Sequence, residues 1–276
     1  MSPPTTTPTT LAQRLVRAKR KIKEAGIPYR IPEGEQLAER VSGVLAVLYL
    51  IFNEGYSATA GDTLLNADLS SMAIALTREL FGLLKDPEAG GLLALMLLHD
   101  ARRAARTDGE GDLVLLEEQD RTQWNRAQII EGEAIIESIL RQAPPGPYAL
   151  QAAIAAVHAQ TVDGGATDWP QIVELYDRLL TLSPSPVVEL NRAVAVAMVA
   201  GADTGLALID AIATRGALRG YYPLHAARAD LLRRSVRYAE AAQAYARAAE
   251  LTLNVAERRF LNRRREQMQH HAGEAR

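Results

Sequence analysis

A pattern of apolar and small residues that recurs about every 34 positions in the last third of this chain constrains its fold most strongly. Each copy has the spacing i, i+3, i+4 and i+7, which places its members on one face of a helix. The outer copies begin at Trp169 and Tyr238, 69 residues apart, and a degenerate middle copy begins at Thr204. A single helical hairpin cannot bury both of its faces, so the repeat predicts hairpins that stack on one another. The three copies are Trp169, Ile172, Val173 and Tyr176; Thr204, Ala207, Leu208 and Ala211; and Tyr238, Ala241, Ala242 and Tyr245.

The period is typical of tetratricopeptide repeats, in which each unit is a pair of antiparallel helices. The sequence predicts the second helices of two units at residues 187–200 and 221–234. A last helix at residues 254–269 is rich in arginine, and we expect it to cap the open end of the stack.

The rest of the chain is also predicted to be helical. Hydrophobic residues make up 48% of the sequence but aromatic residues only 5%, and a core rich in Ala and Leu suits closely packed helices. A long helix should begin at Glu33 and end at Gly55. The short apolar run at residues 113–116 predicts a buried extended segment or, less simply, a strand. Further helices are expected at residues 68–84, 87–106, 122–141 and 148–161.

We therefore expect an all-α protein, in which a helical bundle precedes a tetratricopeptide-like helical-hairpin stack, or α-solenoid. Residues 1–32 are predicted to be a disordered Pro/Thr-rich head with a basic helix and a linker. Residues 33–165 are predicted to form a helical domain, and residues 166–276 the repeats with their capping helix.

The composition excludes several classes of site. The chain has no cysteine, so disulfides and thiolate metal sites cannot form, and a reducing compartment is expected. The first residues lack the apolar core of a signal peptide, and the most apolar runs are too short to span a bilayer. These features predict a soluble cytoplasmic protein without membrane contact.

Positive charge is concentrated at the start of the chain. The whole chain has a net charge of −2, whereas residues 1–30 hold seven basic residues and one acidic residue. A helix with one basic face could contact nucleic-acid phosphates with salt-sensitive affinity, although a solvated helix face explains the charges as well. The candidate nucleic-acid-binding residues are Arg14, Arg17, Lys19, Arg20, Lys21 and Lys23.

Candidate catalytic and metal-binding groups are sparse. His99-Asp100 lies in a predicted helix without a spacing that joins it to His158 or His225, so we predict no metal and no cofactor. The acidic run at residues 117–120 could serve acid–base chemistry but is more simply the start of a helix. A cleft between the two helical halves is a further candidate, and a non-catalytic role is favoured overall. The candidate cleft residues are Asn53, Glu54, Tyr56, His99 and Asp100.

Several long segments together resemble a known family. The chain is similar to the C-terminal extension, with tetratricopeptide-like repeats, of a group of extracytoplasmic-function sigma factors of RNA polymerase. Residues 11–23 resemble the end of the region 4 helix that reads the −35 promoter element, while region 2 and most of region 4 have no counterpart here. The segments are LAQRLVRAKRKIKEAGIPYRIP (11–32), VLAVLYLIFNEGYSA (44–58), LLALMLLHDARRAAR (92–106), LVLLEEQDRTQW (113–124), DWPQIVELYDRLL (168–180), SPVVELNRAVAVAMV (185–199) and HAARADLLRR (225–234).

The resemblance implies a regulatory, protein-binding role in transcription initiation, with RNA polymerase or another protein segment as partner and promoter DNA as a contact of the basic head. The predicted partner-binding residues on the stack are Asn191, Arg192, Arg228 and Asp230, although Arg228 and Asp230 could instead pair within their helix. A stand-alone relative of the extension that binds a small ligand, or catalyses a reaction in the cleft, is the alternative. A remnant without activity of its own is the third hypothesis.

Overall fold

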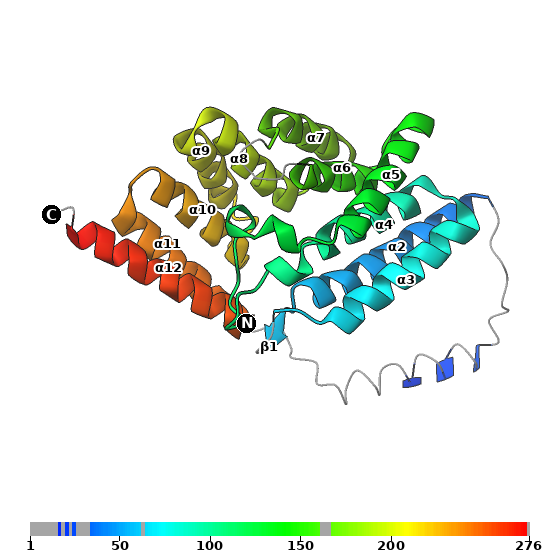
Figure 1. The fold of residues 1–276 in the computed structure, drawn as a ribbon, viewed down its shortest axis with the longest axis horizontal. Coiled ribbons are helices and arrows are strands. Elements are labelled where there is room, and N and C mark those ends of the chain that lie inside the picture. Colours follow the sequence, from blue (N-terminus) through cyan, green and yellow to red (C-terminus); the bar gives the residue numbers. More distant parts are fainter. Residues whose placement is uncertain are drawn as a thin grey trace. The chain divides into compact units, whose positions relative to one another are not determined.

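The computed structural model describes residues 16–17, 20–21, 24–25, 34–61, 64–160 and 167–274. The chain divides into two compact units, Met1–Val44 and Leu45–Arg276. The described residues contain eleven α-helices, three short 3₁₀ helices and two strands of only two residues each (Figure 1). This content confirms the all-α fold class. Among the described residues, no helix has both the length and the apolar character needed to cross a membrane. The predicted domain boundaries after residues 32 and 165 stay predictions.

Helix α2 (Glu35–Tyr56) ends one residue later than predicted, and Gly55 has a different role from the one expected. A Cβ atom at Gly55 would lie 2.5 Å from the backbone nitrogen of Ser70. The Gly55 carbonyl also accepts a hydrogen bond from the Asn66 backbone N–H at 2.7 Å. Gly55 therefore allows close approach to the start of the next helix rather than terminating its own.

Helix α4 (Pro87–Asp100) lies at the centre of the helices that follow α2. Its residues 89–98 are all buried, and it packs against α3 (Ala67–Leu84), α5 (Arg126–Gln142) and α6 (Pro147–Ala159). A helix that is apolar on every face must be surrounded in this way. Glu88 on its first turn accepts hydrogen bonds from two N–H groups of α6, which has no side-chain cap of its own.

The stretch between α4 and α5 is less helical than predicted. Helix α4 stops at Asp100, and only the 3₁₀ helix η1 (Arg103–Ala105) continues it. After the turn at residues 108–111, Leu113 forms an isolated antiparallel bridge with Thr107, and Leu115 has extended backbone angles. The buried extended segment predicted at residues 113–116 is only partly buried, and Leu116 already begins η2 (Leu116–Glu118), which η3 (Arg121–Gln123) follows. Helix α5 begins four residues later than predicted, because Asn125 caps the backbone N–H groups of Ala127 and Gln128.

Six helices form the predicted stack, each packed against the next along the chain (Figure 1). The predicted second helices at residues 187–200 and 221–234 agree with α8 and α10 to within one residue, whereas the capping helix α12 is longer than predicted. The helices are α7 (Trp169–Leu182), α8 (Pro186–Ala200), α9 (Ala202–Thr214), α10 (Tyr222–Arg234), α11 (Tyr238–Leu251) and α12 (Val255–Glu274).

Burial corrects the register of the middle repeat. Of the four predicted positions, Thr204, Ala207 and Ala211 are exposed and only Leu208 is partly buried. The same spacing begins instead at Ala202, and its next three positions, 205, 206 and 209, are buried. The predicted register is wrong because glycine at position 205 has no side chain and does not count as an apolar position. The same lack of a side chain lets α9 approach α8 closely.

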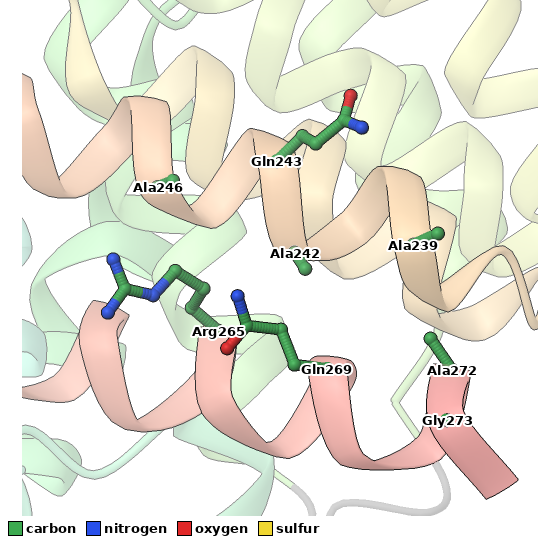
Figure 2. A pocket seen from close by; sticks show the side chains of 8 residues that line it. All are labelled: Ala239, Ala242, Gln243, Ala246, Arg265, Gln269, Ala272 and Gly273. Atoms are coloured by element: carbon green, nitrogen blue, oxygen red, sulfur yellow. The ribbon is translucent and has the colours of Figure 1, made fainter.

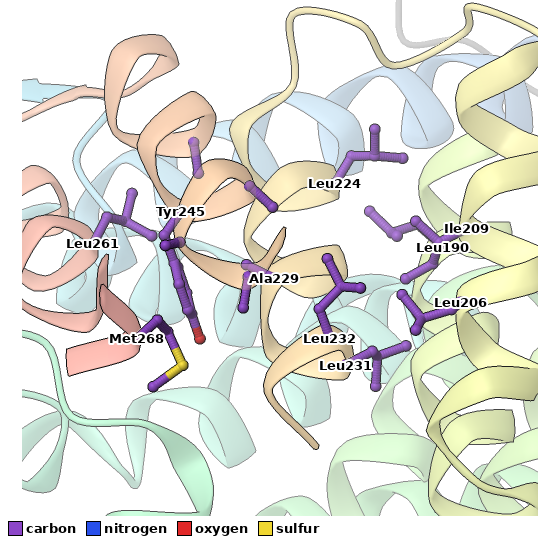
Figure 3. Packing of buried hydrophobic residues seen from close by; sticks show 14 of the residues in the cluster. Leu190, Leu206, Ile209, Leu224, Ala229, Leu231, Leu232, Tyr245, Leu261 and Met268 are labelled. Carbon is purple, nitrogen blue, oxygen red and sulfur yellow. The ribbon is translucent and has the colours of Figure 1, made fainter. Parts of the chain in front are cut away.

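The core of the stack is a continuous cluster contributed by α8 to α12 (Figure 3). Leucine and isoleucine fill the hairpin of α8 and α9, and Tyr245, Leu261 and Met268 fill the end next to α12. Two strands far apart in sequence also pair in parallel, β1 (Ala60–Gly61) with β2 (Leu253–Asn254). They join the chain after α2 to the turn before α12.

Candidate functional site

A concave groove lies on the repeat stack. It encloses about 670 Å³ and is lined by α7, α8, α10, α11 and α12, together with residues 115–117, Arg121, Thr167 and His158 of α6. On α8 the lining positions are 191, 194, 195 and 198, and on α10 they are 226, 227, 230, 231 and 234. Both sets follow the helical spacing of three and four, so one face of each second helix forms the wall of the groove.

The lining combines apolar and polar side chains. Trp169 and Tyr176 from α7 and Met198 from α8 provide large apolar surfaces. Asn191 is exposed in the same groove, and its amide has no hydrogen-bond partner among the described residues. A free amide offers both a donor and an acceptor, as an extended peptide backbone requires.

Three charged groups of the groove, Glu117, Asp230 and Arg234, are paired with one another. Arg234 donates to Asp230 through Nε at 2.7 Å and to Glu117 through Nη2 at 2.6 Å. Arg233 donates to the other oxygen of Asp230 at 2.7 Å. Burial raises the pKa of Asp230, but the hydrogen bonds from Arg234 and Arg233 outweigh burial and hold that pKa below its ordinary value. Asp230 is therefore a carboxylate fixed by two arginines.

Two of the four predicted partner-binding residues line the groove, namely Asn191 and Asp230. Arg192 instead donates to Asp177 on α7 at 2.5 Å, and Arg228 donates to Asp210 on α9 at 2.7 Å. The suggested pair of Arg228 with Asp230 is wrong, because residues two apart lie on different faces of a helix.

An internal segment of the chain, residues 112–118, lies against the same stack. Asp112 accepts hydrogen bonds from Arg259 at 2.7 Å and Arg263 at 3.1 Å, both on α12. Glu117 pairs with Arg234 and Glu118 with Arg264. In Figure 1 this stretch, in green, lies beside α10 and α12.

The apolar residues of this internal segment also contact the stack. Leu113 and Leu115 pack against the stack core, and Leu115, Leu116 and Glu117 line the groove. The sequence reading assigned Glu117 and Glu118 to a helix start and missed this contact. The available signal was an acidic run in one place and an arginine-rich helix in another, which sequence spacing does not connect.

The candidate cleft residues separate into different environments. Tyr56 and His99 meet edge to face with ring centres 5.2 Å apart, and Arg102 donates to the Tyr56 hydroxyl at 2.7 Å. Burial, followed by the nearby charges of Arg102 and Arg106, holds the pKa of His99 well below its ordinary value.

The other three candidate cleft residues have separate partners. Asn53 hydrogen-bonds the Tyr49 side chain, and Glu54 accepts from the Thr59 hydroxyl at 2.6 Å. Asp100 is buried and accepts from Arg103 and from Gln128. None of the five cleft candidates lines the groove described above.

The basic head is described only in part. Arg17, Arg20 and Lys21 are helical and exposed, and Arg20 lies 3.4 Å from Glu24 one turn later. Arg14, Lys19 and Lys23 lie outside the described residues.

Two smaller features complete the candidates. A second cavity of about 520 Å³ lies between α11 and α12, and small residues such as Ala242 and Gly273 form much of its wall (Figure 2). In the described part of the chain, one group of three side chains has the spacing to hold a metal ion: His270, His271 and Glu274, all exposed, with ligand atoms within 4.8 Å of one another.

Comparison with known proteins finds a family model and a relative to which this chain is similar. The model of a family of unknown function, DUF6596, matches residues 40–140. An uncharacterised protein of Rhizobium meliloti (strain 1021) is 44% identical over 265 residues, a match that covers 96% of this chain. The chain spans 62% of the length of that relative. No solved structure matches the chain.

Proposed function

We propose that this chain is the regulatory, protein-binding portion of an extracytoplasmic-function-type sigma factor, and that it acts in transcription initiation through the groove of its repeat stack. The observation that carries the proposal is the groove itself, whose walls are matching faces of α8 and α10. A long open groove on helical repeats suits an extended segment of another protein.

The chemistry of the lining supports peptide binding. Trp169 and Tyr176 offer apolar contact, and the Asn191 amide can hydrogen-bond a peptide backbone. Glu117, Asp230 and Arg234, which could otherwise act as acids or bases, are joined in ion pairs.

The link to transcription depends on the sequence resemblance. Four of the segments that carry it contribute residues to the groove, at 113–124, 168–180, 185–199 and 225–234. The Rhizobium meliloti relative is longer than this chain, which suits a repeat module joined to further domains in that protein.

Binding to immobilised bacterial core RNA polymerase, measured by biolayer interferometry, tests the proposal. We expect the full chain to bind, and Asn191→Trp to weaken binding at least tenfold because an indole would fill the groove. Gln171→Trp on α7 is the matched control, since Gln171 is exposed and does not line the groove. Circular dichroism verifies that each variant is folded.

Two outcomes contradict the proposal. One is a folded wild-type chain that does not bind polymerase. The other is a chain whose binding is lost when residues 1–30 are removed but is unchanged by Asn191→Trp, because the contact would then belong to the basic head and not to the groove.

A further inference from the structure

The internal segment, residues 112–118, has the properties of a peptide bound to the stack. It reads Asp-Leu-Val-Leu-Leu-Glu-Glu, with carboxylates at its ends and four apolar residues between them. Residue 115 has the extended backbone angles φ −64° and ψ 149°. We propose that this segment occupies part of the groove in place of a partner, and that the partner contributes a segment of the same chemistry, leucines between carboxylates, that displaces it. This inference rests on the groove's being the protein-binding surface proposed above.

Charge complementarity defines the ends of the bound segment. The carboxylates of the internal segment meet five arginines on α10 and α12, and a partner segment would need carboxylates at corresponding places to satisfy them. A basic segment, such as the head of this chain, would instead meet like charge. The arginines are Arg233, Arg234, Arg259, Arg263 and Arg264.

Two of the three carboxylates of the internal segment form exposed ion pairs with the stack, which a partner's carboxylates could replace. The side chains of Glu117 and Glu118 are 47% and 46% exposed, whereas that of Asp112 is 9% exposed. Exposed ion pairs contribute little net stability, so the glutamate end of the segment can leave the stack first. Asp112 is then the anchor of the segment.

The leucines of the internal segment make apolar contacts with the stack. Leu113 and Leu115 pack against the stack core but are only partly buried. Leu115 and Leu116 border the open groove, so the site of the internal segment is continuous with the open cavity of about 670 Å³. A partner segment could therefore enter the open part and extend into the place of the internal segment.

An isolated antiparallel β-bridge, Thr107 with Leu113, holds the start of the internal segment to the chain just before it. The Val114 N–H donates to the Arg106 carbonyl at 2.9 Å, the Asp108 N–H to the Asp112 carbonyl at 3.0 Å, and the Asp112 N–H to the Asp108 carboxylate at 2.9 Å. The polar contacts of the segment with α10 and α12, in contrast, are made by side chains, so a partner with the same side chains could reproduce them.

A fluorescent peptide that copies residues 110–120 is the probe, and anisotropy with the full chain is the readout. The opening variant Asp112→Asn/Glu117→Gln/Glu118→Gln keeps side-chain shape but weakens the internal contact. A tethered competitor acts at high effective concentration, so we expect this variant to bind the peptide at least tenfold more tightly than the wild type. Adding Arg234→Gln/Arg263→Gln should abolish that gain.

Two control peptides define the specificity. One replaces every Asp and Glu of the probe by Asn and Gln, and should bind the opening variant at least tenfold more weakly. The other copies the basic residues 13–23 and should not bind. Tighter binding of the basic peptide than of the acidic one would make the head the occupant and overturn the proposal.

Hydrogen exchange in the wild-type chain provides a test that does not depend on the variants. Saturating acidic peptide should speed amide exchange in residues 112–118 by displacing them. Unchanged exchange there, or an opening variant that is folded but binds no more tightly than the wild type, would show that the segment is a fixed structural element. The peptide experiments contain no polymerase, so a negative result in them does not contradict the proposed polymerase contact. A chain that does not bind polymerase would, in turn, leave the result of the peptide experiments unchanged.

Discussion

Arginines surround the two partly buried histidines near the start of the stack. His99 faces Arg102 and Arg106, and His158 faces Arg102 and Arg121. Burial, helped by these positive charges, lowers the pKa of His158 to about 4. A neutral imidazole can adjoin a guanidinium without repulsion, so the native packing requires that both rings remain unprotonated.

The depressed pKa predicts a loss of stability in mild acid. Between pH 6.5 and 4 the unfolded chain protonates His158 and the folded chain does not, so the free energy of unfolding falls as pH falls through this window. The shift corresponds to at most about 3 kcal/mol. We expect His158→Gln to reduce the stability difference between pH 7 and pH 4.5, measured by urea denaturation.

His270→Gln is the control for this pH dependence, since His270 is exposed at 72% of its side-chain surface. A His158→Gln profile parallel to that of the wild type would show that other groups set the acid sensitivity.

At the scale of helices, an ion pair recurs in two hairpins, and a glycine sets the distance between them. The arginines Arg192 and Arg228 each reach back from the second helix of a hairpin to an aspartate on the first. Glycine at position 205 brings α9 close to α8, because a Cβ there would lie 2.4 Å from the Cβ of Ala197 and 2.9 Å from the Ala193 carbonyl oxygen. The ion pairs are partly exposed and contribute little, so close packing determines the spacing of the helices.

Gly205→Ala is therefore expected to destabilise the protein by about 1–3 kcal/mol through overpacking, although Ala is the better helix former. Gly82→Ala in α3 is the matched control, because no atom lies within 4 Å of a Cβ built there. The control should stabilise the protein by up to about 1 kcal/mol. Thermal and urea denaturation measure both, and a stabilising Gly205→Ala would contradict the packing argument.

At the scale of the Leu45–Arg276 unit, residues near both of its ends meet. Besides the pairing of β1 with β2, the Asn254 amide donates to the Ala58 carbonyl at 3.0 Å. The buried carboxylate of Glu257 accepts from Tyr222 and Thr252 at 2.5 Å each, and from Ser57 at 3.4 Å. This contact joins the bundle helices and the stack in one unit.

Asn254→Ala removes both the hydrogen bond to the Ala58 carbonyl and the cap at the start of α12. Asn254 is fully buried, and its Oδ1 accepts from the backbone N–H groups of Ala256 and Glu257 at the start of α12. We expect a loss of about 2–4 kcal/mol in urea denaturation, since a cap and a buried hydrogen bond are lost together.

The exposed cap Asn66→Ala, whose side chain accepts only from the Leu69 N–H, is the control and should cost about 1 kcal/mol. Equal losses for Asn254→Ala and Asn66→Ala would show that the contact with Ala58 adds nothing to stability.

Local patterns in the sequence determined the helices. Apolar spacing placed the starts of the stack helices within one or two residues, because this signal acts over one or two turns. The same patterns placed Asn191 and Asp230 on the stack but could not tell which arginine would pair with Asp230. They also placed the middle repeat two residues out of register, because Gly205 contributes to packing through the absence of a side chain.

Only the tertiary structure brought residues 112–118 to the groove of the repeat stack. Residues 112–118 and the arginines of α12 are more than 140 positions apart, and no local periodicity connects them. Likewise the sequence analysis grouped five residues in one cleft, whereas the fold brings Tyr56 and His99 together and directs Asn53, Glu54 and Asp100 to other partners. Helix formation depends on neighbours in sequence, but the groove and its internal occupant depend on how the helices pack.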